Sequence, residues 1–437
     1  MSQLLNGQFM IKGLAIAVTT LMVGTAHAAK TEQQQIQELR QEVEALKSLI
    51  QQQQQVQQQQ QNQIAQVQQA KPAAPVSALS SLKSKSGADI SIYGSIRGDA
   101  NYIIKGADND FNSAHTSKEE ASDKLRATAK VTRLGLDFNT PVGDNKVGGK
   151  VEVDFASSDN SKSENLRIRH AYLTFNDWLF GQTTSSFASV HAPEMIDFST
   201  NIGGSGGSAR VPQVRYSQKL APATQLFVSA EEGNSKATET GDLSYRLPVL
   251  TAKVTQGFAD GKGLASARAL VEHYKSDAAN DDKTGWGAAV GANYQVAEPL
   301  KVSADVAYMK GNSNHLYGSN TAYSVVGNSI EQNEAVAVQV GATYNFSPKL
   351  RSTLAYGALF ADDGTDYARA AAAVPAVPNT NANANANEKV QQAWINFIYS
   401  PVKPVDLGIE YINGERETFA GEKFSDDRVG FMARYSF

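Results

Sequence analysis

The sequence closes with the alternating stretch RVGFMARYSF, Arg428–Phe437. Its odd positions hold Phe431, Ala433, Tyr435 and Phe437, whereas its even positions hold glycine, methionine, arginine and serine. Successive side chains of a β-strand point to opposite faces, so the stretch predicts a strand with one apolar and one mixed face. An aromatic end would be a liability in a soluble sheet, whereas it suits the interface of a membrane barrel.

The same alternation recurs from Ala88 onward. Segments of about ten alternating residues are separated by polar breaks that are alternately short and long. The pattern predicts sixteen strands, at 90–104, 131–140, 146–157, 166–175, 178–186, 211–220, 224–233, 248–257, 264–275, 285–296, 301–311, 334–346, 351–360, 389–400, 406–415 and 427–437. We expect 242–248 (DLSYRLP) to be a loop, because a seventeenth strand would put the two ends of the barrel on opposite sides.

Three features favour a membrane barrel over a soluble β-sandwich. Charges such as Lys150, Glu152 and Asp154 lie in mid-strand, where a small closed core could not hold them. Glycine and alanine are common on the apolar face, which lipid tolerates better than a core does. Aromatic residues gather at strand ends, as in interfacial girdles; these are Tyr172, Phe175, Trp178, Phe180, Phe346, Trp394, Phe397, Tyr399, Tyr435 and Phe437. We therefore expect an all-β fold, a 16-stranded antiparallel transmembrane β-barrel, with a soluble all-β protein as the alternative.

The N-terminus predicts export. Lys12 precedes the apolar run Gly13–Gly24, and Ala26-His27-Ala28 fits a small-residue cleavage site, so residues 1–28 are expected to be a signal peptide. The apolar run is too short to cross a bilayer as a helix. Either Met1 or Met10 is compatible with initiation.

A coiled coil is predicted over residues 29–70. Heptad spacing continues through a glutamine tract, with apolar core positions at Ile36, Leu39, Val43, Leu46, Ile50, Ile64 and Val67. Their β-branched and leucine pattern nominally favours two helices. Residues 71–87 are rich in proline, alanine and serine and are expected to be a linker to the barrel domain at 88–437. We expect the coil to lie in the periplasm, where it would hold subunits together or contact the cell wall.

The composition argues against enzymes and nucleic-acid binders. The 40 lysines and arginines balance 44 acidic residues, so no basic stripe marks a nucleic-acid surface. The chain has no cysteine, and its six histidines form no paired site, so we expect no metal and no cofactor. The stretch GGSGGSAR lacks the Lys-Ser/Thr of a phosphate loop. An outer-membrane lipase or protease stays a remote alternative.

Several stretches resemble the trimeric porins of Gram-negative bacteria. They are TRLGLDF, PVGDN and GGKVEVDF, then FGQTTSSF before a long third loop, and the final ARYSF. The glutamine-rich coil ahead of a sixteen-strand barrel is similar, more narrowly, to the DcaP-like porins, a dicarboxylate-channel group. The resemblance implies an outer-membrane homotrimer among lipids and lipopolysaccharide. It also implies that Phe431, Tyr435 and Phe437 form a signal for the barrel-assembly machinery.

Alternation puts a set of basic residues on the lumen face. They are Arg97, Arg133, Arg167, Arg169, Arg215, Lys253, Arg268, Arg351 and Arg434. The first four lie on strands that form a basic ladder in related porins. Tyr172 and Phe175 require a bulge or a phase change near Arg169. The alternative is that these arginines pair with wall acids and only hold the barrel's shape.

The resemblance also implies that the third loop, Phe187–Arg210, folds into the pore. It carries Pro193, Glu194, Met195 and Asp197 ahead of a glycine cluster that would let it bend. A basic wall facing these acids predicts passive diffusion of small hydrophilic solutes, preferentially anions such as dicarboxylates. A general or cation-selective porin and a structural barrel that anchors the coil are the alternatives, and an ordinary outer loop is the alternative for Phe187–Arg210.

Overall fold

The computed structural model describes residues 82–85, 87–156, 165–199, 202–204, 210–237, 243–373 and 385–437. The chain divides into two units, Met1–Leu79 and Ser80–Phe437. The predicted signal peptide and coiled coil, and most of the predicted linker, lie outside the described residues and stay predictions.

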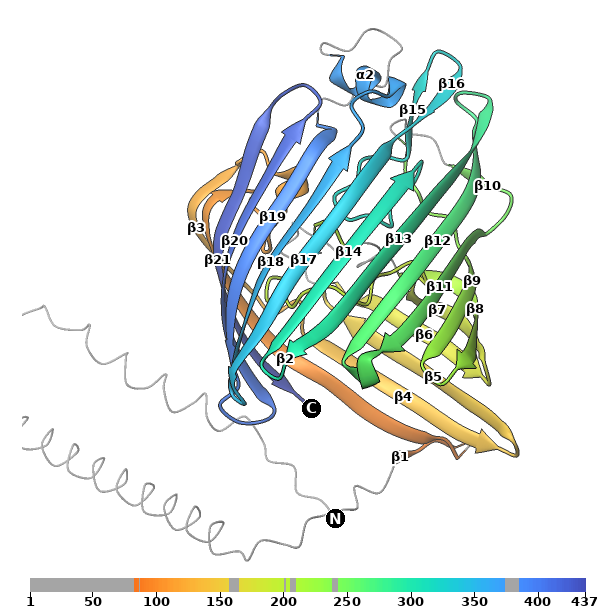
Figure 1. Cartoon of the computed structure of the whole chain (residues 1–437), viewed down its shortest axis with the longest axis vertical. Helices are drawn as coiled ribbons and strands as arrows, with labels where there is room; N and C mark the ends of the chain where they lie inside the picture. The colour runs from red at the N-terminus through yellow and green to blue at the C-terminus, as the bar shows by residue number, and fades with distance from the viewer. Residues whose placement is uncertain are drawn as a thin grey trace, which may run out of the picture. The chain divides into compact units, whose positions relative to one another are not determined.

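The second unit is an all-β, closed antiparallel barrel with sixteen positions around its wall, as the sequence predicted (Figure 1). One position is shared by two short strands, β3 and β4. The wall consists of β2 (Asp89–Gly106), β3 (Ala121–Thr128) with β4 (Arg133–Val142), β5 (Asn145–Asp154), β6 (Arg167–Phe175), β7 (Trp178–Thr184), β8 (Arg210–Ala221), β9 (Thr224–Glu231), β11 (Val249–Phe258), β12 (Gly263–Ser276), β13 (Asp281–Ala297), β14 (Leu300–Lys310), β17 (Glu334–Ser347), β18 (Leu350–Ala361), β19 (Asn387–Tyr399), β20 (Val405–Thr418) and β21 (Lys423–Ser436).

The last strand closes the barrel on the first. Strand β21 pairs with β2 from Ser95↔Ser436 to Lys105↔Asp427. The backbones of Gly94 and Phe437 then exchange two hydrogen bonds of 3.0 Å. The ring of paired strands is therefore closed, which is the condition for a sheet to cross a membrane.

The second wall position is broken in two. The upper half of β2 pairs with β3 and its lower half with β4, while 129–132 interrupts the strand and projects Lys130 and Val131 inward. The sequence prediction began this strand at residue 131 and missed β3. The reason is that β3, ASDKLRAT, alternates poorly and carries charges on both faces.

Four short pieces of strand lie outside the wall count. Strand β1 (Leu82–Lys83) lies inside the predicted linker and pairs with β2. Strand β10 (Ser244–Tyr245) pairs with β12. The loop prediction for 242–248 is thus confirmed for its described residues, because β10 has only two residues and spans nothing. Strands β15 (Tyr323–Val326) and β16 (Ser329–Gln332) form a separate hairpin.

Long loops gather at one end of the barrel and short turns at the other. We number the loops L1 to L8 along the chain, and by the usual orientation of such barrels they face outward from the cell. L6 (311–333) contains the β15–β16 hairpin, and L7 (362–386) contains α2 (Asp366–Ala372). The short helices η1 (Ala114–Thr116) and η2 (Ala259–Gly261) lie in L1 and in a turn. Among the described residues, no helix is long and apolar enough to cross a membrane.

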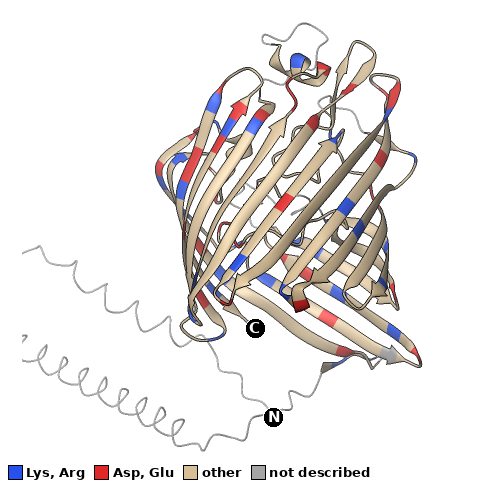
Figure 2. Cartoon of the chain, viewed as in Figure 1, with Lys and Arg blue, Asp and Glu red and all other residues tan. Residues whose placement is uncertain are grey.

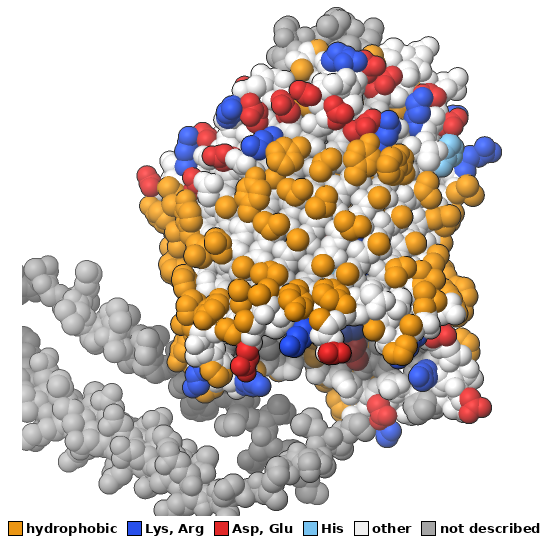
Figure 3. Space-filling model, in the orientation of Figure 1, with side chains coloured by type: hydrophobic (Ala, Val, Ile, Leu, Met, Phe, Trp, Pro, Cys, Tyr) orange, Lys and Arg blue, Asp and Glu red, His pale blue; other side chains and the backbone are white. Residues whose placement is uncertain are grey.

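The outer face is apolar where lipid would contact it. Figure 3 shows apolar side chains in two bands, with charged side chains beyond both bands. Eight of the ten predicted girdle aromatics are exposed on this face, from Phe180 at 40% to Phe346 at 57%. The other two predictions are wrong. Trp394 is buried on the lumen side, and a bulge near Arg169 turns Tyr172 inward.

Candidate functional site: the channel lumen

The described residues of L3 (185–209), which are 185–199 and 202–204, lie inside the barrel, against the wall from β12 to β20. Backbone groups of L3 meet lumen side chains of this wall. The amides of Ile196 and Asp197 donate to the carboxylate of Glu410, at 2.9 and 2.7 Å. The carbonyl of Glu194 accepts from Trp394 Nε1 at 3.0 Å and from Asn396 Nδ2 at 3.1 Å. Buried polar groups on one wall therefore hold the loop in place.

Glycines make room for this close approach. A Cβ atom on Gly357 would lie 1.8 Å from the carbonyl oxygen of Ile202, and one on Gly203 would lie 2.0 Å from that of Val338. Gly203 also has a φ of +77°, which side chains rarely adopt. On the wall, a Cβ on Gly341 would meet Pro193 at 2.5 Å. The loop backbone thus touches the barrel backbone directly.

The four predicted constriction residues have different surroundings. Glu194 forms a bidentate ion pair with Arg351, with both distances 2.7 Å. Pro193 packs on Gly341, and Met195 packs beside Trp394. Asp197 is 5% exposed and accepts hydrogen bonds from the backbone amides of Asn112 and Ser199. The carboxylate of Asp197 therefore serves loop packing rather than an open pore surface.

L1 (107–120) also folds into the lumen, which the sequence analysis did not anticipate. Asn112 donates from Nδ2 to the carbonyl of Asp426 at 2.7 Å and accepts from Gln392 at 2.9 Å. The Phe111 ring lies 5.8 Å from that of Phe198 in L3. L1 and L3 therefore form one packed unit on the β19–β21 side. The signal that could have revealed this is the short Phe-Asn-Ser stretch within an otherwise charged loop.

Two ladder arginines on the wall from β4 to β6 are partly exposed. On this wall, the side chains of Arg133 and Arg167 are 33% and 35% exposed. On the wall that L3 covers, the side chains of Arg268 and Asp305 are 0% and 1% exposed. Exposure also varies along the wall that L3 covers, since the side chains of Arg351 and of its L3 partner Glu194 are 26% and 34% exposed.

The predicted ladder arginines face the lumen but share carboxylates. Arg97 contacts Asp99 through Nε and Nη2 and also donates to the carbonyl of Ile196. The other three pair with two acids: Arg133 with Glu152 at 3.3 Å, Arg167 with Asp154 at 2.7 Å, and Arg169 with both at 2.7 Å. Four guanidinium groups thus meet three carboxylates, so most of the ladder's charge is compensated. Figure 2 shows basic and acidic residues interspersed along the barrel strands.

The five remaining predicted basic residues lie on the lumen face of other strands. Arg268 pairs with Asp305 at 2.6 Å, Arg351 pairs with Glu194, and Arg434 pairs with Asp406. Arg215 and Lys253 instead lie over the ring of Phe227, at 5.7 and 5.2 Å from its centroid. The basic set therefore divides into paired side chains and an aromatic-flanked pair.

Comparison with known proteins identifies the fold and the family together. The family described as "DcaP outer membrane protein" matches residues 21–437. The crystal structure of the outer membrane channel DcaP of Acinetobacter baumannii is 65% identical, with a TM-score of 0.77 over 82% of this chain and 100% of that one. The chain belongs to the DcaP outer membrane protein family. It is a β-barrel protein of the bacterial outer membrane.

More distant structures share the fold alone with this DcaP family member. Salmonella typhi OmpF matches at 15% identity and a TM-score of 0.54, over 81% of this chain and 99% of that one. An anion-selective porin from Comamonas acidovorans matches at 12% identity and a TM-score of 0.52, over 80% of this chain and 100% of that one. No curated protein sequence matches the chain.

The DcaP-family lumen also contains basic residues that the sequence analysis left out. Arg210 begins β8 and lies within the positive field of Arg169, Arg167 and Arg133. Lys150 on β5 pairs with Asp137 at 3.0 Å and lies over the ring of Tyr93. Arg210 was missed because it ends a glycine-rich stretch that reads as loop. Lys150 has the right alternation and could have been included.

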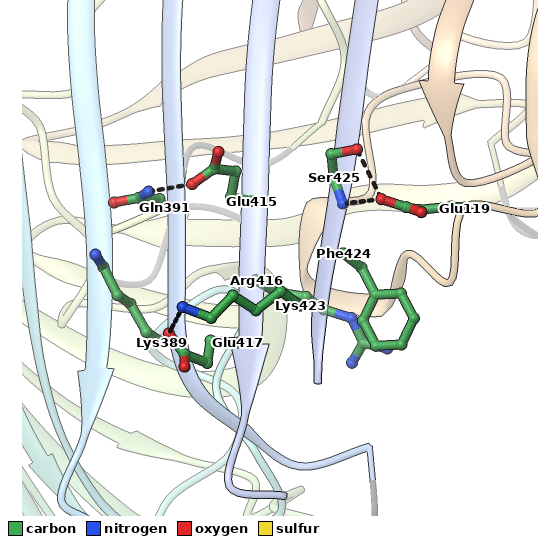
Figure 4. A pocket seen from close by; sticks show the side chains of 9 residues that line it. All are labelled: Glu119, Lys389, Gln391, Glu415, Arg416, Glu417, Lys423, Phe424 and Ser425. Atoms are coloured by element: carbon green, nitrogen blue, oxygen red, sulfur yellow. Dashed lines mark hydrogen bonds and ion pairs between the residues drawn. The ribbon is translucent and has the colours of Figure 1, made fainter. Parts of the chain in front are cut away.

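A separate pocket of about 260 Å³ lies at the loop end of β19, β20 and β21 (Figure 4). Its charges largely satisfy one another. Gln391 donates to Glu415 at 2.6 Å, Lys423 lies 3.2 Å from Glu417, and Ser425 donates to Glu119. The pocket therefore offers little uncompensated charge to a ligand. Elsewhere in the described chain, no group of three or more histidine or acidic side chains could hold a metal ion.

Proposed function

We propose that this DcaP-family barrel is a channel for passive diffusion of small hydrophilic solutes, with a preference for anions that includes dicarboxylates. One observation carries the proposal: the lumen wall from β4 to β6 presents two partly exposed arginines, Arg133 and Arg167, and three guanidinium groups meet two carboxylates there. A planar, permanently charged guanidinium meets a carboxylate through two parallel hydrogen bonds, so it suits transient contact with organic anions.

The pairing within the ladder shapes how this selectivity would work. Each ladder carboxylate holds an arginine in a fixed position while it cancels part of the charge. An anionic solute then meets guanidinium donors of fixed orientation in a weakly positive field. Such a field favours entry of the anion but binds it weakly enough for it to leave. The predicted opposing acids contribute less than expected, because Glu194 is paired with Arg351 and Asp197 is buried.

Single-channel recording in a planar bilayer under a KCl gradient tests the proposal. We expect a reversal potential on the anion-selective side and a current that succinate reduces in a concentration-dependent way. A cation-selective reversal potential would contradict the proposed preference and indicate a general or cation-selective porin. Absence of any conductance would contradict the channel and favour a structural barrel.

A further inference from the structure

Three adjacent strands bring two cations to one aromatic ring in the lumen. Phe227 on β9 is the direct cross-strand neighbour of Lys253 on β11, and Arg215 on β8 lies diagonally across from it. The charged groups of Arg215 and Lys253 lie 5.7 and 5.2 Å from the centre of the Phe227 ring. Strand alternation directs all three side chains inward, since Val214 and Leu250 are exposed on the opposite face.

Neither cation has a carboxylate partner within 4.0 Å in the described part of the chain, unlike the ladder arginines. Lys253 is 9% exposed, and its ammonium group makes one long hydrogen bond, 3.5 Å, to the carbonyl of Ala188 in L3. The Nε of Arg215 is buried and has no hydrogen-bond acceptor among the described residues. Cation–π contact with a phenyl ring compensates only a part of the lost hydration.

Two acids of the neighbouring strands have partners of their own, although Oε2 of Glu231 has no hydrogen-bond donor among the described residues. Glu231 accepts from Thr251 Oγ1 at 2.6 Å and from the amide of Ser186 at 3.0 Å. Asp305 pairs with Arg268 at 2.6 Å and accepts from Ser189 Oγ at 2.6 Å. These carboxylates soften the local field but leave the donors of Arg215 and Lys253 without an acceptor anion.

We propose that Arg215 and Lys253 form an anion-binding site on the channel path beside the start of L3, which takes the carboxylate group of a permeating solute. This inference rests on the proposed channel function. It names the part of the lumen that gives the channel affinity for carboxylate solutes. Lys253 is buried and Arg215 is half-buried with a buried Nε, so both lose hydration without a counter-charge, and an incoming carboxylate supplies an acceptor for both.

The site also differs from the ladder in what an anion must displace. Each ladder arginine is paired with a carboxylate of the wall. An anion that binds such an arginine must replace that carboxylate, which then loses its cationic partner. At Arg215 and Lys253 an anion displaces no carboxylate, and at Lys253 it competes only with the long hydrogen bond to the carbonyl of Ala188. We therefore expect succinate affinity to depend more on this pair than on the total positive charge of the lumen.

Matched charge removals in the full-length protein test the site by the succinate concentration that halves the single-channel current. R215Q and K253Q should each raise this concentration by at least about tenfold, because each removes a charged donor from the site. K219Q is the control, because Lys219 lies on the same face of β8 and is exposed near the turns. It removes the same charge and should change the concentration by less than about twofold. K253R should keep most of the affinity, which separates loss of the site from misfolding.

Two results overturn the inference while the proposed function stands. One is an anion-selective wild type in which R215Q and K253Q behave like K219Q. The other is an anion-selective wild type that succinate does not block. A wild type that is not anion-selective instead contradicts the proposed function itself.

Discussion

Gly357 lies where L3 contacts the wall of the barrel, and a Cβ atom at this position would overlap the loop. Its missing Cβ leaves room for the carbonyl of Ile202, which in turn accepts from Gln339 Nε2 at 3.0 Å. Glycine here serves close packing of two backbones rather than an unusual torsion angle, because its φ lies in the ordinary range.

We predict that G357A displaces L3 from the wall. The added methyl group would overlap the Ile202 carbonyl, so the loop must move inward or the barrel must lose stability, by about 1–3 kcal/mol for overpacking of this kind. Single-channel conductance should decrease or become unsteady. G98A is the matched control, since a Cβ at Gly98 meets nothing within 4 Å. Equal conductance in both variants would contradict the tight fit of L3.

Alternation in the sequence suggests which residues of a strand face the lumen. It does not show which side chains form ion pairs or hydrogen bonds with them. Arg169 illustrates the limit. The pairing of β5 with β6 shifts register between Glu152 and Val153 of β5. This bulge brings Arg169 of β6 to both Glu152 and Asp154. Such contacts depend on the pairing of β5 with β6, which no single segment encodes. The degree of charge compensation in the ladder was therefore beyond sequence reasoning.

At the scale of an element, L3 depends on a neutral histidine. Burial lowers the pKa of His191 to about 4, so its imidazole is uncharged near pH 7. One ring nitrogen, Nδ1, accepts from Asn293 at 3.1 Å, and the other, Nε2, lies 2.8 Å from Ser266 Oγ. Protonation of Nδ1 would remove the acceptor and break the bond to β13.

We predict that this histidine makes the barrel less stable in acid. An unfolded histidine binds a proton below about pH 6.5. The folded one has its pKa near 4, so its contribution to the free energy of unfolding falls as pH decreases between these values. Urea unfolding at pH 7, 5 and 4 measures this. H191Q should lose less stability over the window than the wild type does, and an equal or larger loss in H191Q would contradict the assignment.

L1 shows why loops are harder to predict than strands. A strand is recognisable by its alternation, whereas L1 is held by contacts with residues more than 300 positions away, such as Asp426. The resemblance to porins pointed to L3 alone as the inward loop. The packed unit of L1 and L3 follows from three-dimensional closeness to β21, which becomes visible only in the closed barrel.

At the scale of the whole molecule, the strand count and the strand ranges were largely predictable. Lipid outside and water inside impose opposite polarity on the two faces of every strand, so the repeating pattern is strong. The exception, β3, lies where the wall strand breaks, and its partly exposed Lys124 and Arg126 pair with acids of L1. Lys130 beside this break pairs with Asp110 at 2.8 Å, which explains a polar stretch inside a membrane wall.

Closure predicts an effect at the last residue. Deletion of Phe437 removes its two backbone hydrogen bonds to Gly94 and an exposed aromatic of the lower band, so we expect several-fold less heat-modifiable barrel in the outer membrane. F437A keeps the backbone pairing and should have a smaller effect. F346A, which removes another exposed aromatic away from the seam, is the control. No difference between the deletion and F346A would contradict the importance of the seam.

The position of L1 has a consequence for the order in which the barrel wall and the contacts inside its lumen form. L1 follows the first wall strand, yet it is held by Asp426 on the last, and Arg97 beside it reaches L3 only when both lie in a finished cylinder. A partly assembled sheet therefore has neither an enclosed lumen nor an anchored L1. The inward position of L1 is fixed in the same event that closes the wall, because its contacts need both β2 and β21 in place.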